Sequence, residues 1–104
     1  MSTVSLGELS NFRAGEATTV EREGRILVVV RLDDEIYILD DRCSHEDFSL
    51  AEGEVDEEQR AIECARHGAL FSLETGDALT FPATQPVEKY HTRVINGLVE
   101  VDLP

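Results

Sequence analysis

Two short segments, each with one cysteine and one histidine, constrain this chain more than any other feature of its sequence. Cys43 and His45 enclose one residue, Cys64 and His67 enclose two, and eighteen residues lie between the pairs. Thiolate and imidazole groups are common ligands of zinc and of iron–sulfur centres. Because both cysteines and two of the three histidines fall in these pairs, we predict that a metal centre draws two loops of the chain together.

The order of the ligand types within each pair separates two candidate metals. Zinc fingers usually pair cysteine with cysteine and histidine with histidine, whereas each pair here offers one of each kind. A centre with two different irons suits the mixed arrangement, because one iron takes both thiolates and the other takes both imidazoles. We therefore predict a 2Fe-2S cluster, and keep a zinc-stabilised interaction domain as the alternative. The predicted ligands are Cys43, His45, Cys64 and His67.

Composition and charge indicate what kind of fold the chain adopts and which kinds of partner it can bind. The chain has 104 residues, of which 41% are hydrophobic and 30% charged, as expected for one globular domain with a modest core. Its formal net charge of -13 opposes binding to nucleic acid and to anionic membranes, and favours a partner with a basic docking face.

The first seven residues lack the pattern of a secretion signal, and the longest aliphatic run, residues 26–30, is too short to span a bilayer. We expect a cytoplasmic protein.

Hydrophobic patterning predicts an all-β fold, because the apolar runs are short and none keeps a helical period for long. Residues 25–32 and 35–39 are rich in Val and Ile, and the two-residue link between them predicts a hairpin. A second hairpin is predicted from residues 87–95 and 98–101, since Asn96 and Gly97 tolerate the positive φ of a tight turn.

The region between these hairpins holds every candidate ligand. Weaker strands are expected there at residues 61–63 and 70–73, separated by turns that contain Gly and Pro. The acidic stretch at residues 52–58 is expected to be a solvated turn.

Three segments of the chain match the motifs of a known family: residues 42–45 (Arg-Cys-Ser-His), 64–68 (Cys-Ala-Arg-His-Gly) and 81–86 (Phe-Pro-Ala-Thr-Gln-Pro). They resemble the Rieske ferredoxin family, and most closely its small soluble members that supply electrons to ring-hydroxylating dioxygenases. The last segment is similar to a loop that covers the third side of the cluster in that family. The resemblance implies a single domain over residues 1–104, built of stacked antiparallel sheets, with a small cluster-binding subdomain (about 41–86) inserted in a larger base domain.

The resemblance also implies a range for the reduction potential. Rieske centres lie at about -150 to +300 mV, against about -400 mV for clusters with four cysteine ligands. The high-potential members in respiratory complexes carry an extra cysteine in each cluster loop, and a Ser and a Tyr that donate hydrogen bonds to sulfur. This chain lacks the extra cysteines and has Ala69 and Phe71 at the equivalent positions, so we expect a potential near the low end.

The chain is expected to carry electrons and not to be an oxygenase. A Rieske oxygenase also needs a mononuclear iron held by two histidines and a carboxylate, and only His91 is left once the cluster ligands are assigned. His91 is expected on the surface of a strand. The resemblance implies a flavin-dependent reductase as electron donor and a terminal oxygenase as acceptor. The alternative is a stand-alone Rieske protein that serves iron–sulfur assembly, another reductase system or redox sensing.

Overall fold

A computed structural model describes residues 2–42, 48–65, 68–81 and 85–104. Over these residues the chain forms ten strands and two 3-10 helices, and no α-helix, which confirms the predicted all-β class. None of the described helices has the length and hydrophobicity needed to cross a membrane.

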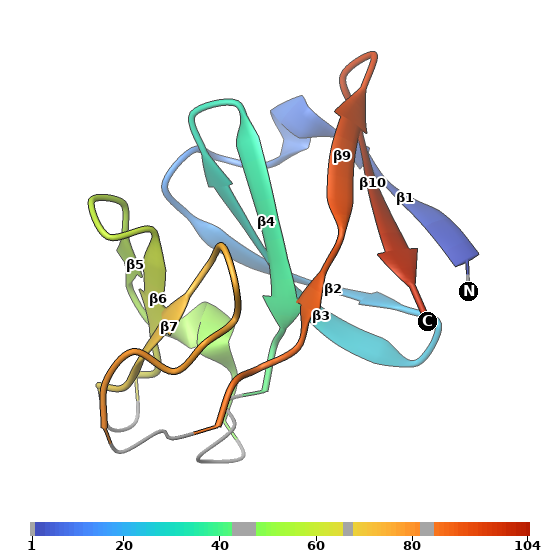
Figure 1. The fold of residues 1–104 in the computed structure, drawn as a ribbon. Helices are drawn as coiled ribbons and strands as arrows, with labels where there is room; N and C mark the ends of the chain where they lie inside the picture. Colours follow the sequence, from blue (N-terminus) through green and yellow to red (C-terminus); the bar gives the residue numbers. More distant parts are fainter. Residues whose placement is uncertain (1, 43–47, 66–67, 82–84) are drawn as a thin grey trace.

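The strands form three antiparallel sheets (Figure 1). The terminal sheet contains β1 (Ser2–Glu8), β10 (Leu98–Leu103) and β9 (Thr92–Ile95) in that order. The central sheet contains β2 (Ala17–Arg22), β3 (Arg25–Leu32), β4 (Glu35–Asp40) and β8 (Lys89–Tyr90). The small sheet contains β5 (Val55–Asp56), β6 (Ala61–Glu63) and β7 (Leu70–Ser72). The 3-10 helices are η1 (Leu9–Asn11) and η2 (Leu50–Glu52).

The central sheet is covered on both faces. Val28 and Val30 of β3 belong to a core that also contains residues of the small sheet, whereas Leu27 and Val29 belong to a second core with residues of the terminal sheet. All four side chains are fully buried. Because alternate residues of a strand point to opposite faces, the aliphatic run is explained by a strand that lies between two cores.

Both predicted hairpins form, and their turns have the expected backbone. Asp33 has φ 54° between β3 and β4, and Asn96 and Gly97 have φ 52° and 80° between β9 and β10. The prediction of one strand over residues 87–95 was wrong, since β8 pairs with β4 in the central sheet and β9 pairs with β10 in the terminal sheet. His91 lies between β8 and β9; its side chain is exposed, as expected, and its carbonyl accepts a hydrogen bond from the Asp102 amide (3.0 Å).

A polar cluster ties the small sheet to the central sheet. Arg60, in the turn between β5 and β6, donates a hydrogen bond to the Tyr37 hydroxyl on β4 (2.8 Å). Tyr37 in turn donates to Glu35 at 2.7 Å, and burial raises the pKa of the Tyr37 hydroxyl. These contacts join the two sheets at the edge of the core that they share.

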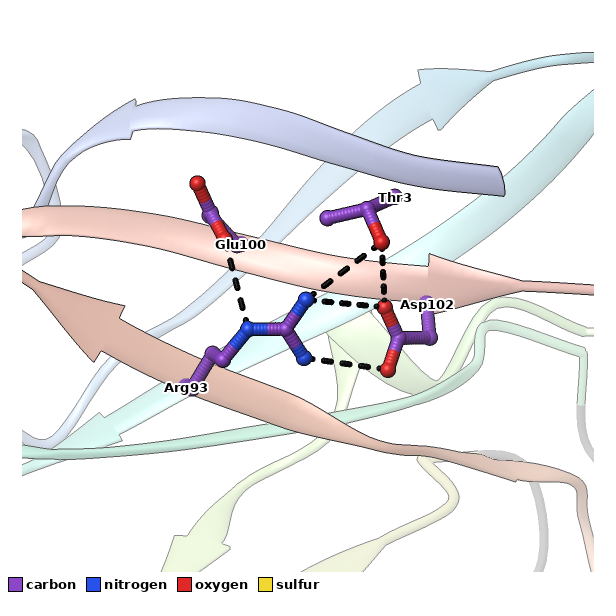
Figure 2. Close-up of polar contacts among 4 residues, drawn as sticks. All are labelled: Thr3, Arg93, Glu100 and Asp102. Atoms are coloured by element: carbon purple, nitrogen blue, oxygen red, sulfur yellow. Dashed lines mark hydrogen bonds and ion pairs between the residues drawn. The ribbon is translucent and has the colours of Figure 1, made fainter. Parts of the chain in front are cut away.

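A second polar cluster crosses all three strands of the terminal sheet (Figure 2). Arg93 on β9 donates two hydrogen bonds to the carboxylate of Asp102 on β10, at 3.0 and 3.1 Å. The hydroxyl of Thr3 on β1 donates to the same carboxylate at 2.7 Å, and Glu100 pairs with Arg93 at 3.3 Å. Hydrogen bonds from Arg93 and then from Thr3 lower the pKa of Asp102 to about 2.

We expect Asp102→Asn to lower the free energy of unfolding at neutral pH and to make it depend less on pH in acid. A carboxylate with a lowered pKa in the folded state stabilises the protein above its ordinary pKa of 3.8, and that contribution is lost as the pH falls from 3.8 towards 2. Urea unfolding should therefore show a gap between wild type and variant at pH 7 that closes over this window. Glu21→Gln, at an exposed position of β2, is the control and should show no such gap. A gap that persists at pH 2 would contradict the assignment.

Candidate metal centre

Of the four predicted ligands, the structure describes Cys64. Cys43, His45 and His67 lie outside the described residues, as do Glu46 and Asp47. The residues that flank them are described, and they show how the two predicted ligand loops begin and end. Within the described part of the chain, no other group of three His, Cys, Asp or Glu side chains is placed to hold a metal ion.

Cys64 follows β6 directly and is buried, with 1% of its surface exposed. Its amide donates a hydrogen bond to the Ala69 carbonyl (2.7 Å), and its carbonyl accepts one from the Gly68 amide (2.9 Å). The chain thus closes on itself across residues 64–69, and Gly68 takes the positive φ of 76° that this closure requires. The two ends of the second predicted loop are therefore joined by backbone hydrogen bonds between β6 and β7.

The first predicted loop is closed by a similar arrangement. Arg42 and Ser49 form an isolated antiparallel bridge. The Asp41 carbonyl accepts a hydrogen bond from the Leu50 amide (2.6 Å), and the Asp41 carboxylate accepts one from the Ala51 amide (3.0 Å). The segment that contains Cys43 and His45 is therefore held together at its base.

Gly53 brings the two loops together. A Cβ atom at Gly53 would lie 1.5 Å from the Glu63 carbonyl oxygen and 3.3 Å from the Ala65 nitrogen. The Glu63 amide also donates a hydrogen bond to the Glu54 carbonyl (2.8 Å). Phe48 and Ala51 pack against the core that includes Cys64. The chain that leaves the first loop therefore lies against the strand that enters the second.

The third predicted segment begins beside the second loop. The Leu79 amide donates to the Leu70 carbonyl (2.7 Å), and the Thr80 hydroxyl accepts a hydrogen bond from the Leu70 amide (2.9 Å). Phe81 follows with 84% of its surface exposed. Residues 82–84 lie outside the described residues, so the covering role of residues 81–86 stays a prediction.

The described residues fit a cluster with mixed ligands. The Cys64 thiol is buried, and hydrogen bonds close the described ends of both predicted ligand loops. Two loops closed in this way can each offer a thiolate and an imidazole to a cluster that lies between them. Sequence reasoning overlooked Asp41 and Gly53, because an acidic residue after a strand and a glycine in an acidic run both resemble ordinary turn residues.

The acidic stretch at residues 52–58 differs in part from the expected turn. Glu52, Glu54, Glu57 and Glu58 are exposed, as expected for solvated side chains. Val55–Asp56, however, forms β5 and pairs with β6. The stretch is therefore the outer edge of the small sheet, with its charges in solvent.

Comparison with known proteins gives a consistent result. A family model described as Rieske [2Fe-2S] domain matches residues 2–91. The 3-phenylpropionate/cinnamic acid dioxygenase ferredoxin subunit of Escherichia coli (strain K12) is 38% identical over 90 residues, which cover 86% of this chain and 83% of that protein. The ferredoxin of carbazole 1,9a-dioxygenase from Nocardioides aromaticivorans IC177 superposes with a TM-score of 0.96 at 28% identity, over 100% of both chains. A chain in a complex of reduced oxygenase and oxidised ferredoxin in carbazole 1,9a-dioxygenase gives a TM-score of 0.88 at 32% identity, over 98% of this chain and 97% of that one.

The fold and the paired loops define a small iron–sulfur electron carrier. The chain belongs to the Rieske [2Fe-2S] domain family, and its cofactor is one Rieske-type 2Fe-2S cluster. The relatives are ferredoxin components, so the expectation of an electron-transfer protein and not an oxygenase is confirmed.

Ala69, just before β7, and Phe71 on β7 lie in the same core as Cys64. Ala69, Phe71 and Leu73 are buried in one core with Cys64, while Leu70 and Ser72 between them are only half-buried. This alternation is consistent with the expectation that residues 69 and 71 are close enough to the centre to influence its potential.

We expect Ala69→Ser with Phe71→Tyr to raise the midpoint potential, because a hydroxyl donor to sulfur favours the electron-rich reduced state. A hydrogen bond that strengthens by about 1 kcal/mol on reduction shifts a one-electron couple by about 40 mV. Voltammetry gives the shift directly. Phe12→Tyr is the control, because Phe12 is buried in the other core and its new hydroxyl should leave the potential unchanged. If the double variant keeps its cluster and its potential, residues 69 and 71 do not face the sulfurs.

Proposed function

We propose that this chain is the ferredoxin component of a ring-hydroxylating dioxygenase system in the cytoplasm. It accepts one electron from a flavin-dependent reductase and passes it to a terminal oxygenase. The observation that carries this proposal is the 38% identity to a dioxygenase ferredoxin subunit over 86% of the chain. A similar fold in a ferredoxin that forms a complex with its oxygenase supports the choice of acceptor.

In this proposal Cys43 and Cys64 bind one iron, and His45 and His67 bind the other. The whole chain is one Rieske domain, and residues 41–86 form its cluster-binding subdomain. The position of Cys64 beside a closed first loop supports this ligand set. When bound, the cluster supplies a site for one electron, and two neutral imidazoles in place of two thiolates make that electron easier to accept.

The chain's own contribution is to hold the ligands and to present a charged surface. Backbone hydrogen bonds at Asp41 and at Cys64 hold the ends of the two ligand loops, which favours a small rearrangement when the charge of the cluster changes. The net charge of -13 attracts a basic partner from a distance, whereas contacts near the cluster determine how long the complex lasts.

We expect the second-order rate of electron transfer to the native oxygenase to fall steeply between low and physiological salt, because ions screen this attraction. Stopped-flow absorbance, with the reduced chain mixed with the oxygenase, measures the rate. Charge reversal at Glu46 or Asp47, next to His45, should slow transfer more than reversal at Glu54 or Glu58.

The two pairs of variants make a matched comparison, because each variant reverses one negative charge in the same chain. A rate that does not respond to salt would mean that the acidic surface serves solubility alone. Greater sensitivity at Glu54 and Glu58, which lie exposed at the edge of the small sheet, would move the docking face away from the cluster loops. If no oxygenase oxidises the reduced chain at any salt concentration, the proposed acceptor is wrong.

A further inference from the structure

Asp41 is the one polar or charged residue that is buried among the described residues, with 6% of its surface exposed. Moving a carboxylate out of water is costly unless hydrogen bonds replace the lost solvent. Here they do, because one carboxylate oxygen accepts a hydrogen bond from the Ala51 amide at 3.0 Å. The Asp41 carboxylate therefore contributes to the local structure and not to the charged surface.

The backbone of Asp41 connects three parts of the molecule. Its amide donates to the carbonyl of Ile26 on β3 (3.1 Å), and its carbonyl accepts from the amide of Leu50 in η2 (2.6 Å). With the carboxylate bond to Ala51, this residue therefore ties the chain that follows β4 to β3 and to the first two residues of η2.

These contacts lie at the entrance and exit of one short segment. Residues 42–49 leave from Asp41 and return at Leu50, and this segment contains Cys43 and His45. Leu50 is fully buried in the same core as Cys64. The position of η2 relative to Asp41 therefore determines where the first loop stands relative to the second.

We propose that Asp41 is a positioning residue for the cluster, and that its carboxylate, by accepting the Ala51 amide, holds the first ligand loop in the shape that cluster binding requires. This rests on the proposed assignment of Cys43 and His45 as ligands. Without the acceptor, the Ala51 amide loses its partner in a half-buried position, which favours movement of η2 and of the loop that precedes it.

The test compares Asp41→Ala with Asp41→Asn in the full chain. Asparagine keeps an acceptor oxygen at the same place and removes the charge, whereas alanine removes both. Asp40→Ala is the matched control, because within the described contacts the neighbouring Asp40 carboxylate accepts no hydrogen bond from residues 48–51. The measurements are iron and sulfide per chain, the half-life of cluster absorbance in air, and the electron paramagnetic resonance spectrum of the reduced protein.

We expect the half-life to fall at least about tenfold in Asp41→Ala and to stay within about twofold of wild type in Asp41→Asn and Asp40→Ala. The g-values should shift or broaden in Asp41→Ala alone. A wild-type half-life and spectrum in Asp41→Ala would overturn the proposal. So would equal loss in Asp41→Asn, since the acceptor would then not be what matters.

If Asp41→Ala does not fold, Asp41→Ser tests the same point, because its shorter hydroxyl reaches the Ala51 amide less well. An intermediate half-life with a folded circular dichroism spectrum supports the proposal, and a wild-type half-life overturns it. Failure of the ligand assignment is distinguishable, because it would appear in the wild-type chain itself as the absence of a 2Fe-2S spectrum or as retention of the cluster in Cys43→Ser.

Discussion

Replacement of Cys64 by serine is expected to abolish the cluster. Serine is nearly isosteric with cysteine, but its hydroxyl is a harder and much less acidic group that binds iron poorly in place of a thiolate. Cys64 is buried and its backbone is fixed by two hydrogen bonds, so no neighbouring residue can move in to replace it without breaking the loop closure. Wild-type protein should contain about two irons and two acid-labile sulfides per chain, and the variant almost none.

Ala65→Ser is the matched control, because it places the same hydroxyl one residue further on, at an exposed position. It should retain the full iron and sulfide content. Cys43→Ser should behave like Cys64→Ser if both thiolates are ligands. Wild-type protein that contains stoichiometric zinc and no sulfide would contradict the assignment and favour the zinc-stabilised alternative.

Cluster loss should affect one part of the molecule more than the rest. The core that contains Cys64 also holds Leu50, Ile62 and Phe71, whereas none of the described residues of the second core belongs to the small sheet. Because metal binding organises the loops that supply the ligands, the small sheet depends on it more than the terminal sheet does. The amide hydrogens of β6 and β7 should therefore exchange faster in Cys64→Ser than in wild type, with a smaller change in β10.

The sequence was sufficient to predict the elements whose signals are local. The turns at Asp33 and Asn96 are set by residues that tolerate positive φ, and the strands beside them are rich in β-branched residues. Residues 61–63 were also predicted correctly, as β6. In contrast, β1 and β2 contain Ser, Thr and Glu and are exposed along one side, so they lack a strong apolar pattern. Their pairing with β10 and β3 is decided by partners elsewhere in the chain.

The site divides in the same way. The ligand types and their spacing are visible in the sequence, because metal chemistry restricts which residues can occupy them. What supports the ligands is not visible, because it consists of contacts that form only when the folded chain brings residues together that are not neighbours in the sequence. The Asp41 carboxylate meets Ala51, and Gly53 meets Glu63, in each case ten residues further along the chain. The division of residues 87–95 between two sheets has the same origin.

Gly53→Ala is expected to destabilise the protein strongly and to lower its cluster content. The added Cβ would lie 1.5 Å from the Glu63 carbonyl oxygen, a distance that no side-chain rotation can relieve because the neighbour is backbone. Gly53 has φ -88°, so an L-residue is acceptable there on conformational grounds and the expected cost is purely steric. Overpacking usually costs about 1–3 kcal/mol, and we expect the upper end or more because two chain segments must separate.

The matched control is Gly97→Ala, which has the opposite combination of properties. Gly97 has φ +80°, and a Cβ atom added there would meet nothing within 4 Å, so alanine should cost about 1–2 kcal/mol through backbone strain alone. That turn joins β9 and β10 of the terminal sheet, well away from β6 and β7 of the small sheet (Figure 1), so iron content should stay at the wild-type level. Gly53→Ala should instead lose iron as it loses stability, because Gly53 lies where the exit of the first loop meets the entrance of the second.

Urea unfolding and iron analysis on the same samples separate the two effects. If Gly53→Ala keeps its iron and is no less stable than Gly97→Ala, the two loops can move apart without cost, and their close contact does not hold the ligands in place.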